Sequence, residues 1–574
     1  MAITVLKLFA FIISNIGAWE FLRRRIKIDI NFLPGLTIAL QVAILYLAGL
    51  AHILKIVAII LWAICIVYLV AAIIKDKNIK FMKNYLNVGF LFLAITMIAM
   101  TIFCIGKVYT TWDNFSHWGI VVKQMFATNR FPNASDAVIF YKEYPLGSAL
   151  YIYYFSGLIS KTESLQLLAQ IYMIVAAIMP VFMFAKKNKI ATLVTTLSFT
   201  NLILVYNILV TDLSVDTLIA AVGTSALLFI YTYCKELKDG KWLYLIAAGI
   251  YLIQVIQIKN PGIFFIVIAI ILMIYWGIRY RDFWPRLITL AMPIVSLVLW
   301  RIHCKVAFSD AETSVHAMTL QNFIKVFTAK SSSALQKIAT EFYKFAFTYK
   351  DFWMVLALFL IVGILIFFLY KEYRKTWLKF FVVSVVLYVL YQIGMLGMYF
   401  FTMPLSEALE LASIKRYTKT ILIVIILIAF IMLIKLIEQL EMKKVLSVAA
   451  VVIAIALPIF FIKLSSGKFK VAVQYLDYPM TIKKNIEKIK DDYEIPEGSS
   501  YTFLLGDEDE GYMYMLGRCS FLSTDVEAVK VSSEENLNNI DSKYIFVLDK
   551  NNKVIDNWIQ NKYPTQADAP VIVR

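Results

Sequence analysis

The chain has 574 residues, of which 61% are apolar and 17% are charged, and its mean hydropathy is +0.74. Soluble domains contain about 45–50% apolar and about 25% charged residues. The composition therefore excludes an ordinary soluble protein, a disordered chain and a collagen-like or coiled-coil rod, and it predicts a polytopic membrane protein. The net charge of +17 does not indicate nucleic-acid binding here, because membrane proteins sort their basic residues by side.

Long apolar stretches predict a mainly α-helical protein with about 14 transmembrane helices. A spanning helix needs about 20 predominantly apolar residues. The first stretch resembles a signal sequence in position, but no small-residue cleavage site precedes its basic cluster, so we count it as a span. The predicted spans are 2–20, 33–54, 56–74, 86–106, 166–185, 190–210, 214–233, 242–258, 262–278, 287–304, 352–370, 380–401, 419–436 and 445–463.

Seven short basic loops separate alternate pairs of these spans. Cytoplasmic loops carry an excess of Lys and Arg, so we assign all seven to the cytoplasm. The N-terminus, the loops 107–165 and 305–351, and the C-terminal segment are then predicted outside. The seven basic loops are 23–25, 75–83, 186–189, 235–241, 279–286, 371–379 and 438–444.

Charge also divides the chain into domains. Residues 464–574 contain 13 basic and 18 acidic residues and no span-length apolar run, whereas residues 1–463 carry a net charge of +22. We expect N-terminal transmembrane helices at 1–85, a second transmembrane region at 86–463, and an extracytoplasmic soluble domain at 464–574.

The C-terminal segment has the pattern of a small α/β domain. Runs at 501–505 and 544–548 are typical of strands, residues 480–490 of a helix, and residues 549–552 of a turn. Four consecutive acids at 507–510 form either a divalent-cation site or a solvated loop.

The loop after the span 86–106 begins with Trp-Asp-Asn-Phe-Ser-His-Trp-Gly at 112–119. On an α-helix over 113–129, the apolar side chains fall on one face and Asp113 and His117 on the other, which predicts an amphipathic helix in the outer interface. Asp113 and His117 are four residues apart and can touch, and a carboxylate beside an imidazole suits general-base chemistry. Alternatively, Asp113 caps the helix and His117 only hydrogen-bonds to it.

The same loop continues through Tyr144-Pro145-Leu146, where the proline is well placed to begin a tyrosine-rich helix over 146–159. This order resembles the GT-C superfamily of polytopic membrane glycosyltransferases: an acidic motif after a span, an interfacial helix, and a "YPPL"-like turn into a second helix. The resemblance covers roughly 86–420 and extends to the soluble outer domain. Asn114 stands where the family has a second acid, and three extra spans precede the motif, so metal binding and the subfamily stay open.

Ionisable residues also lie in three other predicted outer turns, at 211–217, 259–262 and 415–417. Ionisable groups at membrane depth are costly and tend to be functional. Each turn has a structural explanation as well, since Asp212, Ser214 or Asn260 could cap a helix and the lysines could extend to water. Taken together, the acids and bases predict a binding site.

The resemblance implies roles for these residues. Asp113 is the predicted catalytic base, and Lys142, Lys259 and Arg416 would hold the donor phosphate, with arginine able to bind it bidentately. Arg416-Tyr417 resembles an "RY" element of the family. The predicted substrate-binding residues are His117, Lys142, Glu143, Asp212, Asp216, Lys259, Arg416 and Tyr417.

These features predict an inverting enzyme of a bacterial cell membrane. Its expected partners are membrane lipid, a polyprenyl-phosphate-linked sugar as donor, and a cell-surface polymer or glycolipid as acceptor, with no nucleic acid. No cofactor is expected, and no motif supports a metal. The alternatives are a flippase for lipid-linked oligosaccharides, a surface-polysaccharide polymerase or ligase, and a non-catalytic scaffold. Charged residues in the outer loops favour the transferase.

Overall fold

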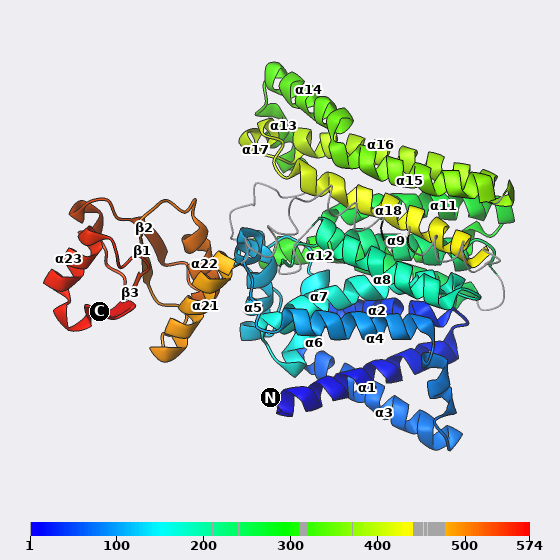
Figure 1. The fold of residues 1–574 in the computed structure, drawn as a ribbon, viewed down its shortest axis with the longest axis horizontal. Coiled ribbons are helices and arrows are strands. Elements are labelled where there is room, and N and C mark those ends of the chain that lie inside the picture. Colours follow the sequence, from blue (N-terminus) through cyan, green and yellow to red (C-terminus); the bar gives the residue numbers. More distant parts are fainter. Residues whose placement is uncertain are drawn as a thin grey trace. The chain divides into compact units, whose positions relative to one another are not determined.

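The computed structural model describes residues 2–207, 212–237, 241–309, 319–369, 371–439 and 477–574, together with Val452 and Ala456. The chain forms two compact units, drawn in Figure 1. Unit 2 joins most of the first predicted outer loop to the C-terminal segment. Unit 1 comprises Met1–Ile105, Glu143–Val210 and Val215–Phe469, and unit 2 comprises Gly106–Lys142, Thr211–Ser214 and Lys470–Arg574.

Unit 1 is a bundle of apolar helices. Among the described residues, eleven helices are long and apolar enough to cross a membrane, and Val88–Cys104 and Trp242–Ile258 are shorter apolar helices. Each predicted span up to 419–436 falls on one of these helices, whereas the span 445–463 lies outside the described residues except at two positions. The mainly helical membrane character is therefore confirmed, and the number of 14 spans stays a prediction.

The elements of unit 1 follow in chain order. The α-helices are α1 (Ala2–Arg25), α2 (Leu33–Leu50), α3 (Leu54–Asp76), α4 (Val88–Cys104), α6 (Gly147–Ile159), α7 (Glu163–Ile178), α8 (Lys189–Tyr206), α9 (Asp216–Tyr233), α10 (Lys241–Ile258), α11 (Ile263–Tyr280), α12 (Phe283–Ala307), α13 (Leu320–Thr328), α14 (Ser332–Thr348), α15 (Lys350–Leu369), α16 (Arg374–Phe401), α17 (Leu405–Leu409) and α18 (Ile414–Gln439). The short 3₁₀ segments are η1 (Ile30–Phe32), η2 (Lys80–Tyr85), η4 (Met179–Phe184), η5 (Asn260–Gly262) and η6 (Lys371–Tyr373).

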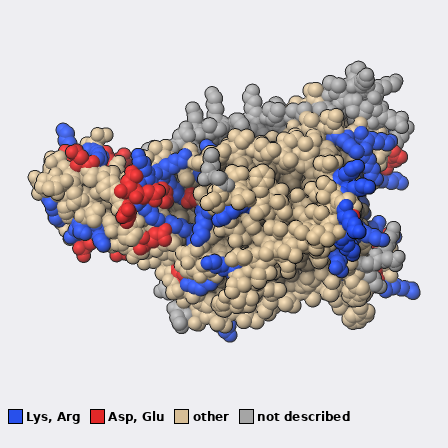
Figure 2. All heavy atoms as spheres, turned by 90° about the horizontal axis from the view of Figure 1, so that it is seen from below, with Lys and Arg blue, Asp and Glu red and all other residues tan. Residues whose placement is uncertain are grey.

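Lys and Arg side chains gather at one end of the bundle, as Figure 2 shows. At this basic end Arg24 on α1 pairs with Asp76 at the end of α3 at 2.5 Å. Arg286 on α12 pairs with Asp282 at 2.7 Å. Glu438, near the end of α18, accepts hydrogen bonds from backbone N–H groups of the basic loop before α8. The assignment of this end to the cytoplasm stays a prediction.

The described part of the loop 305–351 contains the helices α13 and α14. Both helices pack against α16. The buried Lys330 between them donates to the carbonyl oxygens of Phe400 and Met403 at 2.9 and 2.7 Å, which ties their junction to the end of α16.

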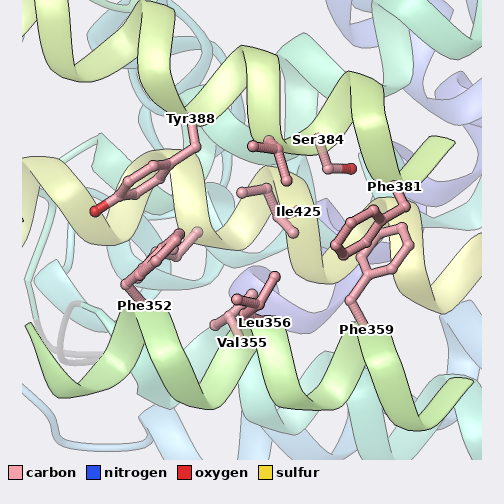
Figure 3. Close-up of a pocket in the computed structure, with 10 residues that line it drawn as sticks. Phe352, Val355, Leu356, Phe359, Phe381, Ser384, Tyr388 and Ile425 are labelled. Atoms are coloured by element: carbon pink, nitrogen blue, oxygen red, sulfur yellow. The ribbon is translucent and has the colours of Figure 1, made fainter. Parts of the chain in front are cut away.

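An apolar crevice lies between α15, α16 and α18 (Figure 3). Aromatic rings form much of its wall: Phe352 and Tyr388 stack with ring centroids 4.2 Å apart, and Phe359 lies 5.7 Å from Phe381. Leu422 and Ile425 of α18 complete the lining. The crevice therefore presents a hydrocarbon and aromatic surface.

Unit 2 contains a four-stranded sheet with the order β2-β1-β3-β4. The first three strands run parallel, and β4 pairs antiparallel with β3. The predicted α/β fold, its helix near 480–490 and its strands at 501–505 and 544–548 are confirmed. The elements are η3, a π-helical turn (Asn114–Trp118), α5 (Gly119–Thr128), α21 (Asp477–Asp492), β1 (Tyr501–Leu505), α22 (Tyr512–Phe521), β2 (Val526–Lys530), η7 (Glu534–Leu537), β3 (Tyr544–Val547), α23 (Lys553–Lys562), η8 (Pro564–Gln566) and β4 (Val571–Val573).

The acidic run at 507–510 serves the local fold of unit 2. The carboxylate of Asp509 accepts hydrogen bonds from the backbone N–H groups of Gly511 and Met513 at 3.1 and 2.6 Å, so it caps α22. Across the described residues, no three His, Cys, Asp or Glu side chains lie close enough together to hold a metal ion.

Candidate functional site: an ion-pair cluster where α9, α11 and α18 begin

Asp216 is the first residue of α9, and its side chain is only 4% exposed. The ammonium of Lys259 donates to Asp216 Oδ1 at 2.8 Å. Lys259 immediately precedes η5 in the turn from α10 to α11, where Pro261 occupies the first turn of the 3₁₀ segment. The side chain of Lys259 is 13% exposed, so the pair lies largely out of solvent.

Arg416, in the first turn of α18, adds a second cation. Its Nε lies 3.7 Å from Asp216 Oδ2. The ring of Tyr417 lies beside both cations, with its centroid 4.9 Å from Lys259 Nζ and 5.4 Å from the guanidinium carbon of Arg416. We call Asp216, Lys259, Arg416 and Tyr417 the Asp216 cluster. It places two cations on one carboxylate.

A second ion pair lies one helical turn further along α18. Lys419 Nζ is 3.6 Å from Asp351 Oδ2 at the start of α15 and donates to the carbonyl oxygen of Tyr206 at 2.9 Å. The hydroxyls of Tyr206 and Tyr349 donate to the same carboxylate oxygen at 3.2 and 3.0 Å. We call these four residues the Asp351 cluster. Its carboxylate accepts two hydrogen bonds and faces one cation, whereas that of Asp216 accepts one hydrogen bond.

Several polar atoms around the Asp216 cluster are buried without a hydrogen bond. Asp216 Oδ2 and the hydroxyls of Thr217 and Thr418 find no hydrogen-bond partner within the described part of the chain. Buried polar groups are nearly always hydrogen-bonded, so such exceptions in a native fold call for an explanation. A bound anion or ordered water would satisfy donors at this site.

The Asp216 cluster brings together residues that the sequence had placed in separate predicted outer turns. Lys259 does not extend to water, as one alternative held, because its ammonium is bonded to Asp216. The proposed cap at Asn260 is also wrong, since the cap position is Lys259 and no side chain bonds there. Lys415 is exposed, which agrees with a solvated lysine at that position.

Asp113 and His117 belong to unit 2. The chain there forms the π-helical turn η3, closed by a hydrogen bond from the N–H of Gly119 to the carbonyl of Asn114. The prediction of a regular amphipathic α-helix is therefore wrong for 114–118, where Phe115 and His117 are both buried. The capping alternative is wrong too, because the Asp113 side chain makes no capping hydrogen bond.

The imidazole of His117 is held by its immediate surroundings. Its Nδ1 lies 2.7 Å from the hydroxyl of Ser116. Its ring lies 4.7 Å from that of Trp118 and makes an edge contact with Tyr141 at 5.0 Å. These contacts fix the ring within the π-helical turn.

Asn114 and Asp212 organise the short segment before α9. The buried side-chain oxygen of Asn114 accepts a hydrogen bond from the N–H of Leu213 at 2.9 Å. Asp212 Oδ1 accepts one from the N–H of Ser214 at 2.8 Å. The cap position of α9 is Val215, without a side-chain bond, so capping of α9 by Asp212 or Ser214 is wrong. Asn114 is therefore a structural amide that fixes the segment before α9.

Lys142 and Glu143 show how the rest of the loop is built. Lys142 Nζ donates to the carbonyl of Ala134 at 3.1 Å, and burial lowers the pKa of its ammonium. In unit 1, burial raises the pKa of the Glu143 carboxyl, against the opposing charge of Arg301. The acid that anchors this loop is one the sequence did not single out: Asp136 pairs with Arg130 at 2.7 Å.

Asp351, Lys419 and Tyr206 were also missed. Each lies at the edge of a predicted span, as do Asp216 and Arg416, so the same reasoning about ionisable residues at membrane depth applies to them.

We compared the chain with known proteins in three ways. No family model, no curated protein and no solved structure matches it.

Proposed function

We propose that this protein is a membrane glycosyltransferase that transfers a sugar from a polyprenyl-phosphate donor to a cell-surface polymer or glycolipid. The observation that carries the proposal is the Asp216 cluster, where Lys259 and Arg416 share one buried carboxylate. A partly buried site with two cations at the end of an apolar bundle suits the phosphate head of a lipid-linked substrate.

Two physical arguments support phosphate as the ligand. Arginine presents a fork of N–H donors that matches phosphate oxygens, and lysine adds a compact charge. Arg416 lies in the first turn of α18 and Lys419 in the second, and the partial positive charge of a helix N-terminus adds to theirs.

The reaction follows from this substrate. The acceptor hydroxyl attacks the anomeric carbon of the donor sugar, and the bond from that carbon to the phosphate oxygen breaks. The electron pair leaves with the polyprenyl phosphate, whose charge Lys259 and Arg416 stabilise. The hydroxyl proton passes to a base, a role that the family resemblance assigns to Asp113. A single displacement inverts the anomeric centre.

The proposal places the sugar transfer on the outer face of a bacterial cell membrane, as the positive loops predict. It requires no cofactor, because phosphate is already a good leaving group once its charge is neutralised.

Reconstitution tests this proposal. Purified protein in liposomes is given a polyprenyl-phosphate sugar and an acceptor glycolipid, and release of polyprenyl phosphate is followed for wild type, Asp113→Asn and Asp507→Asn. We expect turnover by wild type and by the control at the exposed Asp507, and a roughly 100-fold or greater loss for Asp113→Asn, the scale of general-base catalysis. Full activity of Asp113→Asn would remove Asp113 from the mechanism, and movement of donor across the bilayer without turnover would favour a flippase.

A further inference from the structure

The segment 106–142 folds with the C-terminal domain, although the two are far apart in the chain. Both belong to the compact unit 2. The hydroxyl of Tyr512 on α22 donates to the carbonyl of Thr110 at 3.1 Å, across 402 positions of sequence. The segment with the Asp113 motif therefore has tertiary contacts of its own with the domain.

Two cations extend these contacts to the middle of the segment and towards its end. Lys123 on α5 donates to the carbonyls of Cys519 and Ser520 at 2.9 and 2.6 Å. Arg518 on α22 donates to the carbonyl of Ala137 at 2.7 Å. Because every acceptor is a backbone oxygen, these bonds fix where the main chain of one part lies on the other.

Lys483 lies at the centre of this arrangement. It comes from α21, and only 1% of the residue is exposed. Its ammonium lies 4.9 Å from the ring centroid of Tyr109 and 5.1 Å from that of Phe115. A buried cation is costly, and aromatic faces are among the groups that stabilise one. These two rings flank Asp113 in the sequence, four residues before it and two after it.

The packing around Lys483 is close. The ring of Phe115 makes an edge contact with that of Tyr512, with centroids 5.5 Å apart. The ring of Tyr109 lies so near Gly119 that a Cβ added there would come within 2.5 Å of it. Glycine at 119 thus permits the contact that holds Tyr109 against the π-helical turn, and Lys483 lies over the same ring.

We propose that the C-terminal domain is the positioning element for the Asp113 motif, and that Lys483 is its positioning residue. The ammonium holds the rings of Tyr109 and Phe115, and these rings hold the backbone on both sides of Asp113. The inference rests on the proposed function in one respect, namely that Asp113 is the base. The other part of the inference, that Lys483 orders the segment 107–118, does not depend on which reaction the protein catalyses.

The experiment compares the full-length protein with Lys483→Met, which keeps the side-chain length and removes the charge. Lys483→Arg retains the cation, and Lys488→Met removes an exposed lysine from the same helix. Amide hydrogen exchange of 107–118 is measured for each, with β1 and β3 as the control for a folded domain, and kcat and KM for the polyprenyl-phosphate sugar are measured in parallel.

We expect at least 10-fold faster exchange over 107–118 in Lys483→Met, unchanged protection in β1 and β3, and a kcat at least 10-fold lower with an unchanged KM for the donor. Lys488→Met should behave as wild type, and Lys483→Arg should restore most of the protection and of kcat. Unchanged exchange over 107–118 in Lys483→Met would overturn the inference. A wild type without turnover would defeat the proposed function alone, because the exchange measurement decides the role of Lys483 by itself.

Discussion

Two buried carboxylates at opposite ends of the membrane bundle, Glu438 and Asp216, are held in different ways. At the basic end, Glu438 accepts hydrogen bonds from the backbone N–H groups of Lys186, Lys187 and Asn188 and from the hydroxyl of Thr192. At the other end, Asp216 faces two side-chain cations, and its Oδ2 accepts no hydrogen bond from any described residue.

The difference lies in the kind of groups that surround each carboxylate and in how fully they satisfy it. The donors around Glu438 are neutral groups, namely backbone N–H groups of the loop before α8 and the hydroxyl of Thr192 in its first turn, so the carboxylate ties that loop to the start of α8. Glu20, also at the basic end, is bonded by Arg23 and Arg24 of its own helix and by Tyr85. Around Asp216 the two cations come from separate elements, the turn before α11 and the first turn of α18. A carboxylate saturated with hydrogen bonds stabilises the fold, whereas cations that share one incompletely bonded carboxylate can exchange it for an anionic ligand.

Arg416→Gln tests the Asp216 end and carries the largest expected effect. Removing one member of a buried charged site costs several kcal/mol, so we expect a roughly 100-fold fall in kcat/KM for the polyprenyl-phosphate sugar. The matched control is Lys415→Gln, which removes an exposed cation from the same helical turn. Equal losses of kcat/KM in the two variants would show that the activity depends on net charge near the membrane and does not depend on the specific contacts of the Asp216 cluster.

Glu438→Gln tests the basic end. An amide offers one acceptor where the carboxylate offers two, and its NH₂ would face donors, so we expect a loss of about 1–3 kcal/mol in the free energy of unfolding. Thermal unfolding in detergent measures it, with Glu410→Gln as a control at an exposed acid. Because this end holds no ligand in our proposal, donor KM should not change, and a large rise in KM would break the comparison.

Glu497 in unit 2 shows what the same charges do without burial. It also faces two cations, Lys123 at 3.4 Å and Lys490 at 2.9 Å, but its side chain is 42% exposed. Partial burial raises the pKa of this carboxyl, and the two ammonium groups outweigh it, so the pKa lies below its ordinary value.

A depressed carboxyl pKa stabilises the fold above the ordinary value and loses that contribution as the pH falls through the folded value. We therefore expect Glu497→Gln to cost less than about 1 kcal/mol at neutral pH and to weaken the acid dependence of melting below pH about 4.5. Melting temperature as a function of pH, with Glu527→Gln as the exposed control, measures both. A loss as large as that of Arg416→Gln would show that burial does not distinguish the two sites.

The sequence was sufficient to locate the long helices of unit 1, because a membrane span is recognised by the length of its apolar run. It also indicated the ionisable residues at span ends, and the structure brings three of them together in Asp216, Lys259 and Arg416. Their role in binding phosphate stays a prediction, as does the role of Asp113.

Other features could not be predicted because they depend on contacts between distant segments. The prediction of an amphipathic helix over 113–129 assumed the 100° per residue of an α-helix. The π-helical turn at 114–118 breaks that periodicity. Lys123 and Arg518 donate to backbone carbonyls of distant segments, and the local sequence around neither residue has a pattern that would predict this. The strands β2 and β4 were missed because β2 is half polar and β4 has three residues.

The two ends of α18 together restrict how this protein can move. Arg416 ties its beginning to Asp216 on α9, and Glu438 ties its last turn to the N-terminus of α8. Sliding α18 by one turn, about 5.4 Å, would break the attachments at both ends at once. The helix is therefore fixed in register at both ends, and if the bundle opens for the lipid-linked donor that we propose, the opening must come from elements without such double anchorage.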